Sequence, residues 1–258
     1  MASLAEPQFL TVGEGVAARR IAYRRVEGRG PTIVWLGGFK SDMKGTKAEA
    51  LDAFARAGGR AYLRFDYSGH GESDGDFEAG TISRWAEEAA AMVALAGPAP
   101  VLVGSSMGGW ISLLVARQMA SPPAGMVLIA PAADFTEALM WPAFPDEVKR
   151  QIEATGRWVR PSAYDEGGYP ITRALIEDGR RNLVLGGLVE TGCPVRILQG
   201  MQDPDVPWRH AMLLAEKMAR DDVVVTLIKD GDHRLSRDED LARLTEAVET
   251  MAEAYRRA

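Results

Sequence analysis

The stretch Pro100-Val101-Leu102-Val103-Gly104-Ser105-Ser106-Met107-Gly108-Gly109-Trp110 decides the fold. A short apolar run ends in a glycine, turns at a serine and leads into a second apolar segment, residues 110–119. This order predicts the strand, sharp turn and helix of a nucleophile elbow with Ser106 at its apex. Such a turn strains the backbone of its serine, so the positions two before and two after it must be small. Gly104 and Gly108 meet that requirement.

A second stretch, Gly71-Glu72-Ser73-Asp74-Gly75, fits the same G-x-S-x-G pattern. It lies in a polar, glycine-rich region, and neither an apolar strand before it nor a helix after it is expected. Asp74 would also oppose negative charge on the neighbouring serine. Because turn composition explains this stretch, we predict that Ser73 is a loop residue.

The overall composition predicts a cytoplasmic protein with one α/β domain. The 258 residues are 47% hydrophobic, which is enough for one sizeable core. A net charge of −6 without a basic block argues against a nucleic-acid partner. We expect no membrane span, because no apolar stretch approaches the roughly 20 residues required, and no signal peptide. The single cysteine, Cys193, fits a reducing compartment.

Apolar runs alternate with amphipathic segments along most of the chain. This alternation predicts a mostly parallel sheet with helices on both faces, next to an antiparallel pair at the N-terminus. Besides the elbow, we expect strands at residues 9–12, 19–26, 32–36, 61–65, 125–129, 195–199 and 223–228, and helices at residues 47–57, 81–96 and 208–220 and from residue 236 onward.

The alternation stops between residues 134 and 190, a region with two tryptophans and several prolines. Helical patterns occur only at residues 144–155 and 171–185. An insertion of about 55 residues between two strands is too long for an ordinary connection. We therefore predict that residues 134–190 form a cap, within the single domain, over the edge of the sheet where open α/β folds bind ligands.

A serine nucleophile needs a base, and the chain has only three histidines. His233 follows the last predicted strand directly, so it can reach the carboxyl edge of the sheet, and we predict that it is the base. We expect His210, in the first turn of a helix, to be structural or solvated. His70, in an early loop, is either structural or lines the entrance to the site.

The base in turn needs a carboxylate that holds its tautomer. Asp203 lies nearest the end of the strand at residues 195–199, and we predict that it takes this role. Asp205 and Asp232 are the alternatives, although both are also typical turn residues. The order Ser106, Asp203, His233 is that of the α/β hydrolases and differs from the orders of chymotrypsin and subtilisin.

Stabilising the oxyanion of an acyl-transfer reaction requires two backbone N–H groups. The residue after the nucleophile, Met107, supplies one at the start of the following helix. The second is expected in the loop after the strand at residues 32–36, where Gly37-Gly38 allows a close backbone approach. We predict that Phe39 is this donor; the alternative is a simple glycine turn.

Several blocks together make the chain similar to the α/β-hydrolase-domain serine esterases, most closely the branch of mitochondrial palmitoyl-protein thioesterases and acyl-glucuronide esterases. The blocks are the elbow, Arg64-Phe65-Asp66-Tyr67-Ser68-Gly69, Ser73-Asp74-Gly75, Gly156-Arg157-Trp158, Pro161-Ser162-Ala163-Tyr164, the region from Gly200 to Trp208, and Asp232-His233-Arg234. The resemblance implies the α/β-hydrolase fold, the same three catalytic residues, and hydrolysis of acyl esters or thioesters. The chain lacks a mitochondrial presequence pattern, so we expect a bacterial relative.

The leading hypothesis is a serine hydrolase that forms an acyl-Ser106 intermediate on a small-molecule ester or thioester, or on an acylated protein. We expect neither a cofactor nor a metal. A peptidase, an acyltransferase and a non-catalytic ligand receptor on the same fold are the alternatives. Four aromatic residues of the cap either line a substrate channel or only pack the cap: Trp141, Phe144, Trp158 and Tyr164.

Overall fold

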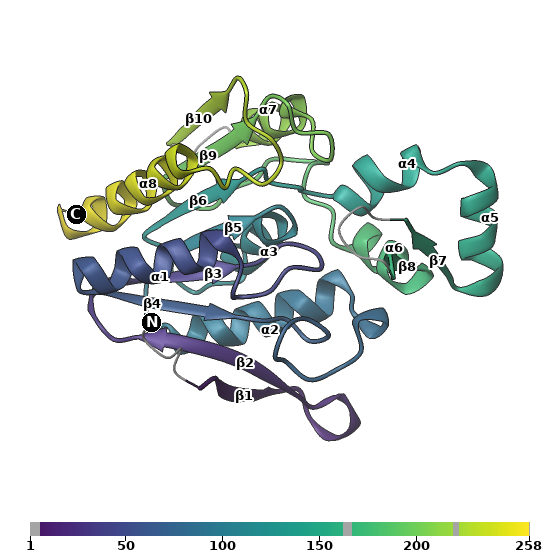
Figure 1. The fold of residues 1–258 in the computed structure, drawn as a ribbon, viewed down its shortest axis with the longest axis horizontal. Helices are drawn as coiled ribbons and strands as arrows, with labels where there is room; N and C mark the ends of the chain where they lie inside the picture. The colour runs from purple at the N-terminus through teal and green to yellow at the C-terminus, as the bar shows by residue number, and fades with distance from the viewer. Residues whose placement is uncertain (1–5, 162–166, 219–221, 258) are drawn as a thin grey trace.

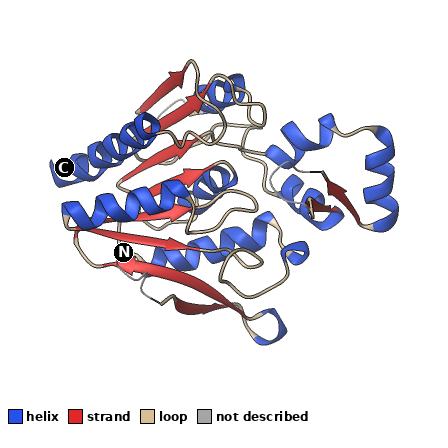
Figure 2. Cartoon of the chain, viewed as in Figure 1, coloured by secondary structure: helices blue, strands red, loops and turns tan. Residues whose placement is uncertain are grey.

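An eight-stranded sheet runs through the middle of the described part of the chain (Figures 1 and 2). The structure is a computed structural model and describes residues 6–161, 167–218 and 222–257. The strand order is β1-β2-β4-β3-β5-β6-β9-β10. β2 pairs antiparallel with β1 and β4, and every other pair is parallel, which confirms the predicted sheet. The strands are β1 (Gln8–Val12), β2 (Arg19–Val26), β3 (Arg29–Leu36), β4 (Arg60–Phe65), β5 (Val101–Ser105), β6 (Gly125–Ile129), β9 (Val195–Gly200) and β10 (Val223–Ile228).

Helices cover both faces of this sheet (Figure 2). Alternate residues of β3 show the two sides: Ile33 and Trp35 pack in the cluster that includes α1 and α8, whereas Val34 and Leu36 pack in the cluster that includes α2, α3 and α7. Because both faces are buried, the central strands read as continuous apolar runs. The helices are α1 (Thr46–Gly58), α2 (Ile82–Leu95), α3 (Met107–Ala116), α7 (Trp208–Lys217) and α8 (Asp238–Arg257), with short 3₁₀ turns η1 (Gly15–Ala17) and η2 (Phe77–Ala79).

The described part of residues 134–190 protrudes on one side of the sheet (Figure 1). It contains a small antiparallel hairpin that the sequence did not predict, in which Trp158 pairs with Ile171. The predicted helix at 171–185 is therefore wrong at both ends, since residues 171 and 172 belong to a strand and the helix ends at Arg181. The elements are η3 (Thr136–Met140, a π-helix), α4 (Trp141–Ala143), α5 (Asp146–Thr155), β7 (Arg157–Arg160), β8 (Tyr169–Thr172) and α6 (Arg173–Arg181).

Helix α6 ties this segment to the rest of the molecule. Leu175 is 2% exposed and belongs to the same apolar cluster as helices α2 and α3. The buried carboxylate of Asp178 accepts hydrogen bonds from the N–H and the hydroxyl of Ser83 in α2, at 2.7 and 2.9 Å. The segment thus shares a core with the sheet and its helices.

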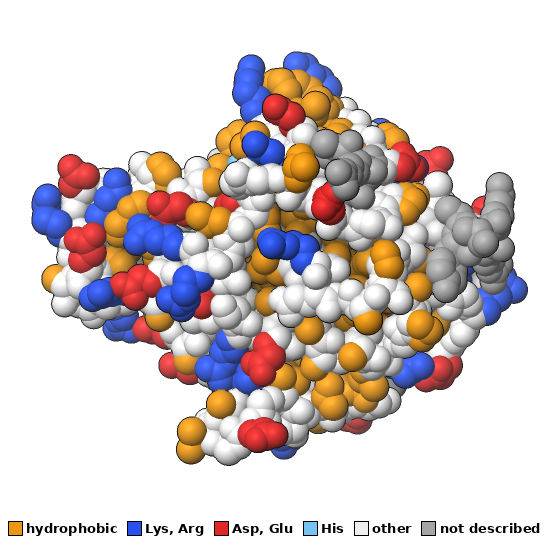
Figure 3. Space-filling view, turned by 180° about the vertical axis from the view of Figure 1, so that it is seen from behind, with side chains coloured by type: hydrophobic (Ala, Val, Ile, Leu, Met, Phe, Trp, Pro, Cys, Tyr) orange, Lys and Arg blue, Asp and Glu red, His pale blue; other side chains and the backbone are white. Residues whose placement is uncertain are grey.

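The surface carries charges of both signs. On the face shown in Figure 3, Lys and Arg side chains are interspersed with Asp and Glu side chains rather than gathered in one patch. None of the helices in the described ranges is long and apolar enough to cross a membrane.

We expect Leu175→Ala to lower the free energy of unfolding by about 2–5 kcal/mol, because it leaves a cavity in the shared core. The matched control is Leu183→Ala, at a leucine that is 42% exposed, where the change should stay within about 0.5 kcal/mol. Urea unfolding followed by tryptophan fluorescence measures both. Equal effects of the two variants would show that α6 does not share the core.

Candidate active site

Ser106 stands at the apex of a strand–turn–helix between β5 and α3, as predicted. Its φ of 54° and ψ of −116° are sparsely populated by residues with a side chain. Neighbouring backbone holds it there, because its N–H donates to Ile129 O at 2.8 Å. Its carbonyl oxygen accepts the N–H groups of Gly109 and Ala132 at 2.9 and 3.1 Å. The strain is therefore supported from β6 and from the first turn of α3.

Two glycines make this turn possible by close backbone approach. A Cβ on Gly108 would lie 2.0 Å from the carbonyl oxygen of Leu36, at the end of β3. A Cβ on Gly104 would lie 2.5 Å from both Gly108 O and Ser112 Oγ. The size requirement inferred from the sequence is confirmed at both positions.

The structure brings the three predicted catalytic side chains into one hydrogen-bonded line. His233 Nε2 lies 3.2 Å from Ser106 Oγ, and His233 Nδ1 lies 2.7 Å from Asp203 Oδ2. The Asp203 side chain is fully buried, while that of His233 is 25% exposed. Because an ionised carboxylate only accepts hydrogen bonds, Nδ1 carries the proton and the lone pair of Nε2 faces the serine hydroxyl.

Asp203 is itself held by three donors. Its Oδ1 accepts the N–H groups of Asp205 and Val206, both at 2.8 Å. Its Oδ2 accepts a hydrogen bond from Gln199 Nε2 at 3.3 Å. The buried Gln199 amide also donates to the carbonyl oxygens of Gly200 and Val206. Sequence reasoning missed Gln199, although an amide side chain at the carboxyl end of the predicted strand, four residues before Asp203, was an available signal.

The alternative carboxylates have other surroundings. Asp205 is exposed, and its carboxylate lies 3.8 Å from the guanidinium of Arg160. Asp232 is exposed and accepts the N–H of Leu235, a turn contact. Donor atoms of Asp203, Asp205 and His233 lie within 4.8 Å of one another, a spacing that a metal ion could share. Because Asp203 and His233 are already hydrogen-bonded to each other, we interpret these two side chains as partners of Ser106.

The remaining serine and histidine candidates have structural contacts. Ser73 Oγ donates to Asp66 O at 2.6 Å and accepts the N–H of Ala22 at 2.8 Å, which confirms it as a loop residue. His210 is buried, and its Nε2 lies 2.7 Å from Ala133 O. Burial lowers the pKa of His210. His70 is also buried, beside the loop that follows β3.

The two predicted oxyanion donors lie on the segments that meet at Ser106. A Cβ on Gly38 would be 3.4 Å from Ser106 Cβ, so the loop after β3 runs directly beside the elbow. Met107 is the first residue of α3, where N–H groups have no partner within the helix. Among the described residues, no acceptor contacts the N–H of Phe39.

The predicted substrate-lining aromatics form a packed group in the protruding segment. Phe144 is 8% exposed, and its ring centroid lies 5.2 Å from that of Trp158 and 6.3 Å from that of Trp141. Phe39, like Trp141 and Trp158, packs against the buried cluster that Phe144 forms with three isoleucines, Ile152, Ile171 and Ile176. Tyr164 lies outside the described residues. A role of these side chains in substrate binding stays a prediction.

Residues 33–247 match the alpha/beta hydrolase family. The chain belongs to this family. Mitochondrial palmitoyl-protein thioesterase ABHD10 of Bos taurus is 36% identical over 233 residues, covering 90% of this chain and 76% of that protein. A crystal structure from Agrobacterium vitis S4 shares 48% identity with a TM-score of 0.92, covering 96% of this chain and 98% of that one. Alpha/beta hydrolase domain-containing protein 10 from mouse shares 34% identity with a TM-score of 0.87, covering 96% and 99%.

These relatives confirm the fold class and the resemblance inferred from the sequence blocks. The ABHD10 relatives are named as mitochondrial proteins. The cytoplasmic location of this alpha/beta hydrolase stays a prediction.

Because a Cβ on Gly108 would collide with backbone, we expect Gly108→Ala to lower the free energy of unfolding by at least about 2 kcal/mol. Gly186→Ala is the control, since within the described residues no heavy atom apart from its chain neighbours lies within 4 Å of a Cβ at that position. Urea unfolding of both purified variants measures their free energies of unfolding. Identical stabilities would mean that the elbow tolerates a side chain next to β3.

Proposed function

We propose that the protein is a serine hydrolase that cleaves carboxylic esters or acyl thioesters through an acyl-Ser106 intermediate. The observation that carries this proposal is the line of hydrogen bonds from Ser106 Oγ through His233 to the buried Asp203 carboxylate. Membership of the alpha/beta hydrolase family supports it. The reaction needs no cofactor, because these three side chains supply the nucleophile and move the proton.

In the first half of the reaction, Ser106 Oγ attacks the acyl carbon while His233 Nε2 takes the hydroxyl proton. The N–H groups of Phe39 and Met107 stabilise the oxyanion of the tetrahedral intermediate. His233 then gives its proton to the leaving alkoxide or thiolate as the acyl–oxygen or acyl–sulfur bond breaks. Asp203 holds the Nδ1 proton throughout and stabilises the imidazolium.

In the second half, water takes the place of the leaving group. His233 removes a proton from this water as it attacks the acyl carbon, and then returns the proton to Ser106 Oγ as the carboxylic acid leaves. Acyl transfer to an alcohol would use the same residues. Release of the free acid in water, without added alcohol, distinguishes hydrolysis from transfer.

The proposed substrate class is an acyl thioester or ester, including an acylated protein. The name palmitoyl-protein thioesterase of the ABHD10 relatives supports it. We propose that residues 134–190 act as a cap that contacts the acyl group. The apolar group around Phe144, with Trp141 and Trp158, supports that role because it also packs against Phe39, a proposed oxyanion donor.

We expect Ser106→Ala to abolish labelling by a fluorophosphonate probe and to lower p-nitrophenyl ester turnover by at least about 10⁴-fold. The second G-x-S-x-G supplies the matched control, since folded Ser73→Ala protein should keep its labelling. Gel fluorescence and initial rates measure both properties.

Labelling that persists in Ser106→Ala would remove the serine assignment. A wild-type protein that neither labels nor cleaves esters would favour the non-catalytic receptor. Cleavage of peptides but not of esters would favour the peptidase.

We expect kcat/KM to rise with acyl length in a series of acyl thioesters and p-nitrophenyl esters from two to sixteen carbons. Each methylene buried against an apolar cap contributes up to about 0.8 kcal/mol, or roughly a threefold to fourfold gain, until the apolar surface is used up. Measurement of both series on one preparation also compares thioesters with esters. Rates that are flat or falling with length would exclude a long acyl chain as the preferred substrate while leaving hydrolysis intact.

A further inference from the structure

Two backbone N–H groups of the loop after β3 donate hydrogen bonds to side chains of the loop after β4, which carries the second G-x-S-x-G. The N–H of Lys40 donates to His70 Nε2 at 3.1 Å. The N–H of Met43 donates to Asp66 Oδ1 at 2.6 Å. Phe39, the proposed oxyanion donor, directly precedes Lys40 in the chain.

From this geometry we propose that His70 is a positioning residue for catalysis. It holds the loop of residues 37–40 in the conformation that presents the N–H of Phe39 to the oxyanion. The inference rests on the proposed function, because it assigns His70 a role in that same reaction.

The protonation state of His70 follows from its contacts. Since Lys40 N–H is a donor, Nε2 must offer a lone pair, and the ring proton must sit on Nδ1. Nδ1 lies 3.1 Å from Ser68 O, where that proton has an acceptor. Burial of the ring lowers the pKa of His70 to about 4, so the imidazole is neutral at neutral pH. Nε2 is therefore available as the acceptor for the N–H of Lys40 at neutral pH.

The contact helps to hold a strained backbone conformation. Lys40 has a φ of 58°, in the left-handed region that residues with a side chain seldom adopt. Because the peptide group between Phe39 and Lys40 is planar, fixing the N–H of Lys40 also fixes the carbonyl of Phe39 and limits rotation at that residue. His70 thus acts one peptide away from the proposed donor.

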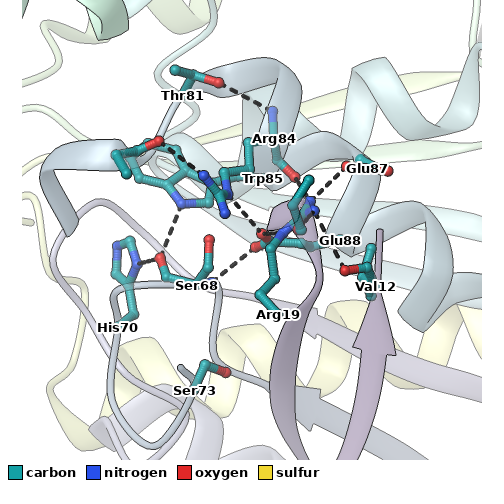
Figure 4. Close-up of polar contacts among 12 residues, drawn as sticks. Val12, Arg19, Ser68, His70, Ser73, Thr81, Arg84, Trp85, Glu87 and Glu88 are labelled. Atoms are coloured by element: carbon teal, nitrogen blue, oxygen red, sulfur yellow. Dashed lines mark hydrogen bonds and ion pairs between the residues drawn. The ribbon is translucent and has the colours of Figure 1, made fainter. Parts of the chain in front are cut away.

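His70 is itself fixed from behind by a buried polar network, drawn in Figure 4. Ser68 O accepts both His70 Nδ1–H and Trp85 Nε1–H, and Ser68 N–H donates to Glu88 Oε2 at 2.8 Å. Glu88 is fully buried and pairs with Arg19 of β2, whose Nε lies 2.5 Å from Oε1. Breaking a buried ion pair is strongly unfavourable, so this network gives His70 a rigid support.

An aromatic cluster fixes the side chains of the same two loops. The His70 ring lies 5.1 Å from the ring of Phe77 and 5.3 Å from that of Trp85. The Phe39 ring contacts the same two residues, at 4.9 and 6.0 Å. A substitution that tests the hydrogen bond must therefore preserve this packing.

The test compares three variants in ester hydrolysis. His70→Phe keeps an aromatic ring but removes the acceptor, and His70→Gln restores an acceptor through its amide oxygen. Tyr67→Phe is the packing control, because its ring lies 5.8 Å from that of His70 and its buried hydroxyl has no hydrogen-bond partner among the described residues.

We expect kcat to fall about 10-fold to 100-fold in His70→Phe, with KM within about twofold. The loss is smaller than the 10²–10³-fold cost of deleting an oxyanion donor, since the N–H of Phe39 is displaced and not removed. His70→Gln should recover most of the rate, and Tyr67→Phe should match wild type. Inhibition by a phenylboronic acid, which forms a tetrahedral adduct with the serine, should weaken in His70→Phe in step with kcat.

Wild-type kcat in folded His70→Phe would overturn the proposal, as would an equal loss in all three variants, which would indicate packing alone. Hydrogen exchange of the Lys40 amide, measured by NMR, gives a readout that does not depend on activity. We expect protection in wild-type protein and faster exchange in His70→Phe. Should His70→Phe fail to fold, an unprotected Lys40 amide in the wild type would by itself overturn the proposal.

Failure of the proposed function has a different signature. If wild-type protein cleaves no ester and takes up no fluorophosphonate at Ser106, the catalytic assignment fails whatever the His70 variants do. If Ser106→Ala abolishes an activity that His70→Phe leaves unchanged, the hydrolase stands and only the role of His70 is lost.

Discussion

The site depends on one close contact between backbones, where the first turn of α3 meets the end of β3. Gly108 approaches Leu36 O so closely that no side chain fits between them. This contact places the loop after β3 beside Ser106, and the hydrogen bonds from β6 hold the strained serine in place. Since β3, β5 and β6 are neighbours in a parallel sheet, their carboxyl ends bring the proposed nucleophile, its backbone support and the proposed oxyanion loop to one edge.

A buried carboxylate is the second constraint. Asp203 has no cationic side chain in hydrogen-bonding contact among the described residues, so its charge is balanced by donors. Two backbone N–H groups and the amide of Gln199 occupy most of its acceptor sites. The site that remains is taken by His233 Nδ1–H, and this fixes both the tautomer and the direction of the ring. Gln199 of β9 thereby contributes to the geometry at Ser106 through Asp203 and His233.

The sequence predicted the elbow, the sheet and the three side chains, because parallel strands bring residues after their carboxyl ends to one edge. It could not choose firmly between Asp203 and Asp205, because the two aspartates lie two residues apart in the same loop. Only the structure shows that Asp203 is the one hydrogen-bonded to His233. The β7–β8 hairpin was missed because the pairing of Trp158 with Ile171 is non-local and leaves the helical pattern of residues 171–185 unbroken. The contact of His70 with Lys40 spans thirty residues and has no local signal.

In the second G-x-S-x-G, the first glycine is required because its backbone lies close to a side chain. Gly71, with a φ of 47°, lets the loop fold onto the carboxylate of Asp66, where a Cβ would lie 2.1 Å from Oδ2. That fold turns His70 and Asp66 toward the loop after β3. The two serines differ in what faces their hydroxyls: Ser73 Oγ has a fixed backbone donor and acceptor, whereas Ser106 Oγ faces the imidazole of His233. The G-x-S-x-G around Ser106 therefore supplies the proposed nucleophile. The loop that carries the second G-x-S-x-G supports the loop after β3, which lies beside Ser106.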